Sequence, residues 1–527
     1  MPTTTAQSTL TPEPVVRLEN YFQDPYSLAV ATARTCYSSR VISTDDVNKD
    51  DKSREQRDRI AESIYKAGHH TTIQHPTFQF VLEKVSRQFI WSFLHAHPFY
   101  NSEQVSQRYV EVKPENFTVP PLDEEARAVY LDCVHDQMDA YHQLIDLIEP
   151  VVVREYRRIF PSRSTEEKRW ASAIKKRCQE VARYVLPVAT HAHLYHTVSG
   201  LTLHRYWRLC QQYDVPLEQR IVVQKMVEEV SKIDADFMRL AQEPIPLDQT
   251  VEYQAFQQFH GSTRNGTTKR FLDEFDRELN GATSKLIDYK VNAEESLAQG
   301  VRSVLGLTQD QLTVEQAIAM VLDPAKNHYL AEALTLTTVS KLSRAMVHPH
   351  FTFKKKISHT ADSQDQRHRM VPGSRPILAC HFVSGRSDYI LPPLIAASSE
   401  AEACYRAIMD RTWAAIDRLL NLGVSEESAL YLLPNAFPIR FEESGDLLHF
   451  HHKWVQRLCY TAQEEIWAAS RDEVLEISQR FPRIAQYLQA PCWVRSQANA
   501  KPFCPEGDRF CGVPVWKLPL ESYQRLI

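Results

Sequence analysis

Apolar side chains recur at helical spacing over two long segments of the chain. Residues 122–160 and 398–420 place them three or four positions apart, which predicts two long helices, and Gly423 follows the second as an expected C-cap. Residues 78–82 alternate instead, a pattern that is typical of a strand. Short strands followed by long helices predict an α+β fold.

Further helices are expected around these segments. One begins near Asp24, and a second begins at the capping-box sequence of residues 164–167 and ends before Leu186. Two more are expected over residues 217–238 and about 446–470. The polar residues between the halves, with their glycine, threonine and asparagine, are interpreted as a linker.

The chain carries one set of sequence signals twice. HPTFQF at residues 75–80 returns as HPHFTF at residues 348–353, and a Leu-Pro pair follows in both halves, at residues 186–187 and 433–434. Self-similarity over such a distance indicates a duplicated domain, not a solenoid repeat. The polar residues that differ between the two copies are therefore the first candidates for chemistry.

The duplication gives a domain plan. We expect, in order, a disordered arm (1–14), a first domain (15–240), a linker that leads into the second copy (241–300), a second domain (301–485) and a C-terminal tail that contains cysteines (486–527).

Composition narrows the class of protein. A hydrophobic share of 43% and a charged share of 24% over 527 residues are those of an ordinary globular chain. Only 13 glycines, with no glycine-rich phosphate motif, argue against a nucleotide loop of that type. The net charge of −5 gives no reason to expect nucleic-acid binding. No segment has the length of a membrane span or the pattern of a signal peptide, and the ten scattered cysteines fit a reducing compartment, so we expect a cytoplasmic protein.

The strongest chemical signal is Arg367-His368-Arg369. Two guanidinium groups two residues apart face the same way on an extended segment, and such forks suit phosphate groups and the carbonyl edge of a planar heterocycle. Alone, the run would indicate a solvated basic turn. Its context adds Gln364 three residues upstream, and Arg457 before the sequence AQEEI.

Taken together, these motifs resemble the flavin-dependent thymidylate synthase family. The resemblance covers roughly residues 15–238 and, more weakly, 333–470. The first copy contributes motifs in the family's order at residues 33–37, 67–70, 74–76, 86–87, 106–109 and 182–187. It implies two tandem domains in which long helices pack on a short mixed or antiparallel sheet. It also implies FAD, dUMP as substrate, and methylenetetrahydrofolate and NADPH as co-substrates for reductive methylation of dUMP to dTMP.

The resemblance also implies roles for single residues. The flavin would contact His75, His348, Arg367, His368 and Arg369. The nucleotide would contact Arg108, Arg183, Gln364 and Arg457, and the catalytic residues would be Ser106 and Arg457.

Each copy departs from the family pattern, in a different place. The first copy has Leu94-His95-Ala96 where Arg-His-Arg belongs, and the second has Leu430 where the arginine before Leu-Pro belongs. Both copies lack the family's Asn-x-Arg, which is replaced by residues 199–201 and 446–448. Elsewhere, the family residues that one copy has lost are kept by the other, so we expect one hybrid site built from both copies. Because two fused copies would replace two subunits of a tetramer, we also expect a homodimer. The alternative is a catalytically inactive flavin- or nucleotide-binding homologue.

Histidine and cysteine patterns supply a third hypothesis. The pairs His95/His97 and His191/His193 have metal-ligand spacing and would suit a metal-dependent hydrolase, although no clear acidic ligand accompanies them. We predict no metal site. The only weak candidates are the tail thiols Cys492, Cys504 and Cys511, one short of a closed zinc site unless a fourth ligand comes from elsewhere in space.

Overall fold

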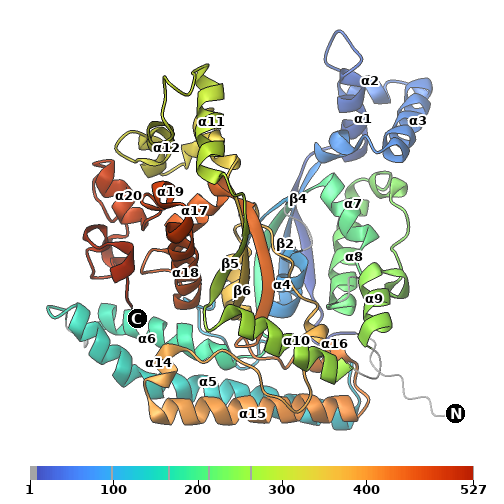
Figure 1. Cartoon of the computed structure of the whole chain (residues 1–527). Helices are drawn as coiled ribbons and strands as arrows, with labels where there is room; N and C mark the ends of the chain where they lie inside the picture. Colours follow the sequence, from blue (N-terminus) through green and yellow to red (C-terminus); the bar gives the residue numbers. More distant parts are fainter. Residues whose placement is uncertain (1–8, 96–98, 164–166, 212–213, 261–263, 526) are drawn as a thin grey trace.

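The computed structural model describes the whole chain except residues 1–8, 96–98, 164–166, 212–213, 261–263 and 526. Figure 1 shows two sheets that stand side by side in the middle of the molecule, above a base of long helices. Two separate groups of helices, one from each half of the chain, rise above the sheets.

Both sheets are antiparallel, as the α+β prediction requires. The first sheet has the order β1-β2-β4-β3, and the second has the order β5-β6-β7. Their strands are β1 (Val15–Tyr21), β2 (Thr77–Ser86), β3 (Tyr100–Gln104), β4 (His191–Ser199), β5 (Ser284–Tyr289), β6 (His350–Ser358) and β7 (Pro438–Asp446).

The α-helices of the first half surround the first sheet. They are α1 (Pro25–Thr35), α2 (Thr44–Asn48), α3 (Asp51–Ala67), α4 (Arg87–His95), α5 (Glu124–Ile159), α6 (Lys168–Ala182), α7 (Gly200–Arg208) and α8 (Pro216–Ile233). Asp123 caps α5 by accepting a hydrogen bond from the Ala126 amide, and its first turn is acidic, which favours a helix start there.

The later helices repeat much of this order. They are α9 (Val251–His260), α10 (Arg264–Leu279), α11 (Ala293–Leu305), α12 (Val314–Leu322), α13 (His359–Asp365), α14 (Pro393–Ala396), α15 (Ser399–Asn421), α16 (Glu426–Leu430), α17 (Leu447–Arg457), α18 (Glu464–Arg480), α19 (Pro482–Ala485) and α20 (Pro491–Gln497). The long helices α5 and α15 correspond to each other and pack together across the base in Figure 1.

The duplication extends to single hydrogen bonds. The buried carboxylate of Glu218 accepts hydrogen bonds from the Ser86 hydroxyl (2.6 Å) and from Tyr431 of the other copy (2.5 Å). The second copy mirrors this arrangement. The carboxylate of Glu465 accepts hydrogen bonds from the Ser358 hydroxyl (2.7 Å) and from Tyr184 of the first copy (2.6 Å). Each copy therefore sends a tyrosine into the other copy's core.

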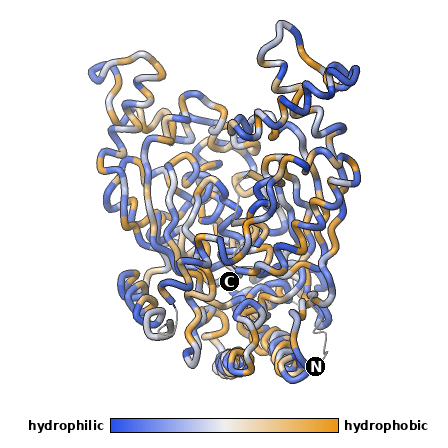
Figure 2. The backbone as a smooth tube through the Cα atoms, turned by 90° about the vertical axis from the view of Figure 1, so that its right-hand side faces the viewer, coloured by the Kyte–Doolittle hydropathy of each residue, from blue (hydrophilic) through white to orange (hydrophobic). Residues whose placement is uncertain are grey.

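The two Leu-Pro signals meet at the centre of this pseudo-symmetry. The Val188 amide donates to the Leu433 carbonyl, and the Asn435 amide donates to the Leu186 carbonyl, both at 2.8 Å. One apolar core runs through both copies at this junction, and a second lies within the second copy and the tail. Figure 2 shows apolar and polar positions alternating along much of the backbone, as expected for segments with one buried face.

Several predicted boundaries differ from the structure. The expected helix over residues 446–470 is two helices, α17 and α18, because residues 458–463 leave the helical path. The predicted linker contains β5, the edge strand of the second sheet. In the predicted disordered arm, residues 1–8 lie outside the described residues, but Leu10 is buried and Thr11 pairs with Val119.

The capping-box prediction at residues 164–167 lies mostly outside the described residues, and α6 begins at Lys168. The tail contains α20 and packs Val515, Leu520 and Tyr523 into the second core. In the described part of the chain, no helix combines the length and the apolar character that a bilayer crossing requires.

Candidate functional site

The Arg-His-Arg run of the second copy lies against the edge strand of the first sheet. The run occupies the turn after α13, not a strand. Arg367 forms an ion pair with Glu103 on β3 at 2.8 Å, and Arg369 donates to the Asn101 side chain at 3.4 Å. The Arg369 guanidinium also lies 4.9 Å from the ring centre of Tyr100. The signal that the first copy lacks is thus supplied to it by the second.

A small cavity of about 50 Å³ opens beside this contact. That is room for a few water-sized groups, hence for one anionic head group and not for a whole nucleotide. Both copies line it: the first with Arg87, Ser106 and Arg183, and the second with Ser363, Gln364 and Arg367. Four of the predicted site residues, Ser106, Arg183, Gln364 and Arg367, are thereby brought together.

Two buried arginines make the inner wall of this cavity cationic. Arg87 is 8% exposed and Arg183 is 4% exposed, and neither forms an ion pair with the described residues. Burial, and then repulsion from Arg183, lowers the pKa of Arg87 to about 9. Burial also lowers the pKa of Arg183, whose Nη2 has no hydrogen-bond partner among the described groups. Two buried cations and a free donor are the arrangement that an anion would stabilise.

The backbone around these arginines is held by hydrogen bonds within the first copy and between the copies. Arg87 donates to the Val105 carbonyl of its own copy at 2.8 Å. The side-chain amide of Asn435, from the second copy, donates to the Arg183 carbonyl at 3.0 Å and to the Gln107 side chain at 3.2 Å. The sequence signals for Arg87 and Asn435 were present, next to Ser86 and the second Leu-Pro pair, but no role was assigned to either residue.

Arg457 and Arg108 lie behind the cavity and do not line it. Arg457 donates to the Gln364 carbonyl at 3.0 Å and to Nε2 of His368 at 2.9 Å. Burial, with Arg457 next in effect, holds the pKa of His368 well below its usual value, so this imidazole is neutral and accepts the hydrogen bond. Arg108 donates to Glu180 at 2.7 Å and to the Thr461 carbonyl at 2.8 Å. Both arginines line a larger, neighbouring cavity instead.

His75 and His348, the remaining predicted flavin contacts, lie away from the small cavity. Both are exposed, each at the start of the central strand of its own sheet. His348 lines an open groove beside α11, where a Cβ added to Gly300 would meet the imidazole at 2.5 Å. The structure therefore separates these two histidines from Arg367, His368 and Arg369.

The pseudo-symmetric position on the other side has lost its cations. The counterparts of Arg87 and Arg183 there are His359 and Leu430, which follow Ser358 and precede the second Leu-Pro pair at the same spacing. Leu430 is buried and carries no charge, so this side has no equivalent of the cationic wall.

Other side chains fill the space instead. The Trp91 indole donates to Asp362 at 2.7 Å, and the Arg375 guanidinium pairs with the same carboxylate at 3.0 Å. The Trp91 ring also lies 5.2 Å from that of His359. An indole and a guanidinium thus already occupy the Asp362 carboxylate at the mirrored position.

The Asn-x-Arg positions have become helix caps. The Ser199 hydroxyl accepts from the Thr202 amide at 3.3 Å at the start of α7, and Asp446 accepts from the His449 amide at 3.1 Å at the start of α17. Their side chains are therefore used within the helices that follow.

The described histidines of the two pairs do not form a metal site with other side chains that the structure describes. His191 and His193 share one face of β4, where burial lowers the pKa of His191 to about 4, whereas His97 lies outside the described residues. Among the residues that the structure describes, no three histidine, cysteine, aspartate or glutamate side chains converge on a single ion. The metal-dependent hydrolase hypothesis gains no support here.

Comparison with known proteins gives a consistent set of matches. The family described as "Thymidylate synthase complementing protein" matches residues 17–234 and again residues 285–483. The flavin-dependent thymidylate synthase of Clostridium tetani is 25% identical over 221 residues, 41% of this chain and 82% of that protein. The corresponding protein of Nitratidesulfovibrio vulgaris is 27% identical over 207 residues, 38% of this chain and 76% of that protein.

Among solved structures, the UMP/dUMP methylase PolB from Streptomyces cacaoi, bound with 5-Br dUMP, is similar to part of the chain. It shares 16% sequence identity with a TM-score of 0.30, over 43% of this chain and 94% of that one. A likeness of this strength carries no argument about the site.

Proposed function

This chain belongs to the thymidylate synthase complementing protein family, with two tandem copies of the family domain, and we propose that it methylates dUMP to dTMP with the aid of FAD at one hybrid site. The observation that carries the proposal is the cavity in which Arg87 and Arg183 of the first copy face Gln364 and Arg367 of the second.

The cationic wall suits the phosphate of the nucleotide. A phosphate placed there would accept a hydrogen bond from the unpartnered Nη2 of Arg183 and would be attracted by the charge of Arg87. It would thereby offset the free-energy cost of burying both cations. Ser106 and Gln364 line the same cavity and are positioned to contact the rest of the nucleotide at its mouth. Positioning and electrostatic stabilisation are what a protein contributes to such a reaction.

The flavin fits the Arg-His-Arg turn more readily than the separated histidines. Arg367, His368 and Arg369 lie next to the nucleotide cavity and between the two copies. The flavin, when bound, supplies the hydride for the reduction. The chain's own part is to hold the ring and the nucleotide in contact: Arg457 fixes the neutral His368 and the backbone of Gln364, and so sets the shape of the turn.

The use of methylenetetrahydrofolate and NADPH, a cytoplasmic location and a homodimer belong to the same proposal. The dimer is supported by exposed apolar side chains on the helical groups that rise above the sheets. Tyr37 is 94% exposed on the first copy, and Leu334 is 81% exposed on the second. Static light scattering should give twice the mass of one chain, whereas a monomer would exclude a pseudo-tetramer.

A second candidate is a nucleotide-binding homologue without flavin. The observation that favours it is the conversion of both Asn-x-Arg positions into helix caps at Ser199 and Asp446.

The absorption spectrum of the purified protein separates the two candidates. A flavin band at ~450 nm that survives desalting after FAD is added, with FAD recovered from the denatured protein, would support the synthase. A protein that retains no FAD and whose melting temperature rises with dUMP alone would support the binding homologue. If the hybrid site works, Arg367→Ala and Arg183→Ala, one from each copy, each abolish dUMP-dependent turnover, and full activity in either variant would contradict it.

A further inference from the structure

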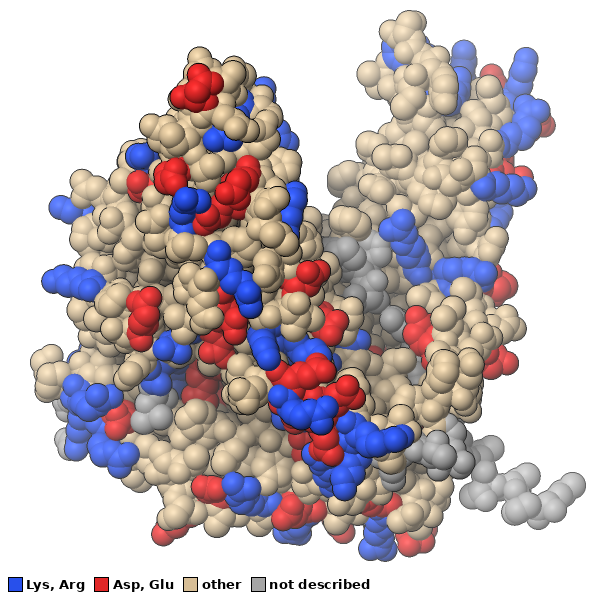
Figure 3. All heavy atoms as spheres, in the orientation of Figure 1, with Lys and Arg blue, Asp and Glu red and all other residues tan. Residues whose placement is uncertain are grey.

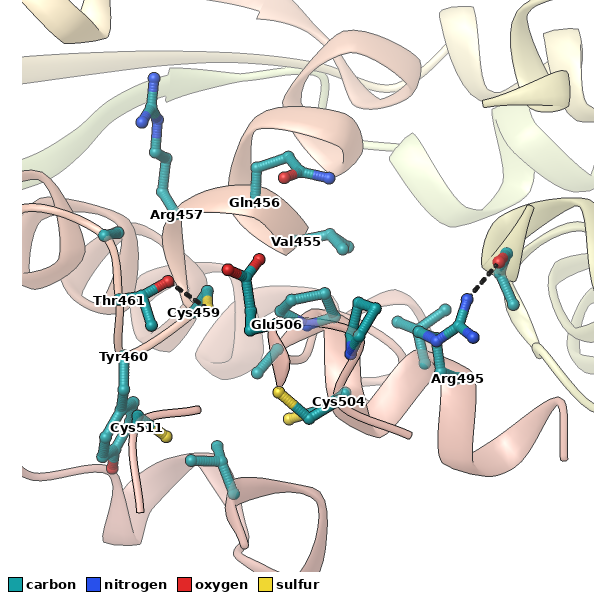
Figure 4. Close-up of a pocket in the computed structure, with 18 of the residues that line it drawn as sticks. Val455, Gln456, Arg457, Cys459, Tyr460, Thr461, Arg495, Cys504, Glu506 and Cys511 are labelled. Atoms are coloured by element: carbon teal, nitrogen blue, oxygen red, sulfur yellow. Dashed lines mark hydrogen bonds between the residues drawn. The ribbon is translucent and has the colours of Figure 1, made fainter. Parts of the chain in front are cut away.

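Four cysteines from distant parts of the sequence gather around one cavity. Cys459 follows α17, whereas Cys492, Cys504 and Cys511 come from the tail. The cavity has a volume of about 460 Å³ and lies between the tail and the turn that joins α17 to α18. Figure 4 shows Cys459, Cys504 and Cys511 on separate segments around it. Cys459 is the fourth thiol that the sequence pattern lacked.

The four thiols share the lining of this one cavity. Cys459 lies at the turn between α17 and α18, and the other three lie on the tail that covers it. None of the four forms a disulfide. All four are partly buried free thiols, and a bound metal would be held by them as thiolates.

The spacing of the thiols decides which metal group fits. No three of the described side chains converge on one ion, whereas a tetrahedral zinc needs all four sulfurs at about 2.3 Å from a single centre. An iron–sulfur cluster spreads its ligands, because each thiolate binds an iron atom of a polynuclear core. Thiols that are near one another, but around a cavity and not around a point, match the second arrangement.

The surroundings suit such a cluster. The Thr461 hydroxyl lies 3.1 Å from Sγ of Cys459. Hydrogen bonds to sulfur are among the features that tune such clusters. Arg457 and Arg495 line the same cavity and offer positive charge near the thiols.

We propose that Cys459, Cys492, Cys504 and Cys511 bind an iron–sulfur cluster in this cavity. The cluster would tie the tail to the turn after α17. Arg108 and Arg457 line the same cavity, and Arg457 also donates to the backbone of Gln364. The cluster would therefore be separated from the proposed nucleotide site by these arginines. The proposal concerns a group that the synthase reaction does not need, and it stands or falls independently of that reaction.

The test is metal analysis of the full-length protein, purified without oxygen from iron-supplied cells. We expect about four iron and four acid-labile sulfide ions per chain. Reduction with dithionite should give the paramagnetic resonance signal of a reduced cluster, which is distinct from that of a flavin radical. One zinc ion per chain, or neither iron nor sulfide even after reconstitution with ferrous iron and sulfide, would overturn the proposal.

Variants show whether the iron is held by these thiols. Cys459→Ala and Cys504→Ala should each lose most of the iron and sulfide. Cys36→Ala and Cys404→Ala, which alter cysteines outside the cavity, should keep them. Equal iron in all four variants would identify adventitious metal and contradict the proposal. Should the cavity variants fold poorly, the wild-type analysis still decides the matter, and it does so whether or not the protein methylates dUMP.

Discussion

A single pair of residues distinguishes the two pseudo-symmetric positions. Arg183 and Leu430 occupy the same place before their Leu-Pro pairs, and both are buried. A buried leucine stabilises a core, whereas Arg183, which interacts with the nearby Glu180 but leaves its Nη2 without a hydrogen-bond partner, is stabilised further when an anion joins it. Arg183 therefore suits the binding of an anion, whereas Leu430 contributes to the packing of the core.

Replacement of Arg183 by its own counterpart tests this contrast. Arg183→Leu should weaken dUMP binding by about 10- to 100-fold, the loss of one strong charge-assisted hydrogen bond. Because the cation has no ion pair in the described structure, the melting temperature should not fall. Calorimetry and thermal denaturation measure the two effects separately.

Arg418→Leu, on an exposed side chain of α15, is the matched control and should change neither quantity. Unfolding of the Arg183→Leu protein with no specific loss of binding would assign Arg183 a structural role instead.

Local motifs in the sequence marked several residues that the fold brings together, but they did not show which partner each side chain reaches. Ser106, Arg183, Gln364 and Arg367 were each marked by a motif, and the structure brings them together. Arg108 was marked in the same way but faces Glu180, because only the fold determines which carboxylate an arginine reaches.

Among elements, α6 carries a pH-sensitive contact that faces the site. Although burial opposes it, Arg177 and Arg108 lower the pKa of Glu180 from 4.5 to about 2. A carboxylate whose pKa falls on folding contributes stability above its unfolded pKa, and this contribution disappears as the pH falls from about 4.5 to about 2.

We therefore expect Glu180→Gln to lose about 3 kcal/mol of stability at neutral pH and to show a weaker acid dependence than the wild type. Urea unfolding at neutral and acidic pH measures both. If the two proteins lost stability equally on acidification, the contact would not be the cause.

A buried network of charges supports the turn that carries Arg-His-Arg. Lys355 of β6 lies 2.7 Å from Glu443 of β7, and Lys453 of α17 lies 2.9 Å from Asp365, the last residue of α13. Lys355 also lies 2.7 Å from Glu473 of α18. All five side chains are at least 99% buried.

In the first copy, the corresponding places belong to apolar and aromatic side chains: Leu82, His196, Tyr206, Phe93 and Met226. The repeat of HPTFQF as HPHFTF marked the start of β6, but it could not show that β6 turns a lysine inward. Such a lysine is tolerated here because it has partners on three other elements.

Lys355→Leu alone should cost about 3–5 kcal/mol of unfolding free energy, since it leaves buried carboxylates without a partner. Exchange of all five charged residues for their first-copy counterparts should cost much less, because no unpaired charge remains. Denaturant unfolding compares the single and the fivefold variants. A fivefold variant that lost five times as much stability as the single one would refute cooperative pairing.

For the whole molecule, the pseudo-symmetry sets an upper limit of two sites, and the side chains leave one. The first position combines Arg87 and Arg183 with the Arg-His-Arg turn of the second copy, whereas the other is filled by Trp91 and Asp362. Figure 3 shows charged side chains of both signs mixed over one face, with no single-sign field to guide an anion elsewhere on that face.

Titration calorimetry with dUMP should consequently give about one nucleotide per chain, half of the two that the duplicated fold would allow. Arg183→Leu should weaken that one event without revealing a second, and Leu430→Ala should leave both affinity and stoichiometry unchanged because Leu430 belongs to the filled position. Two equivalent nucleotides per chain would show that the mirrored position still binds, and the hybrid-site proposal would then fail even if the protein were an active synthase. An unchanged affinity for dUMP after loss of Arg183 would instead place the site elsewhere in the molecule.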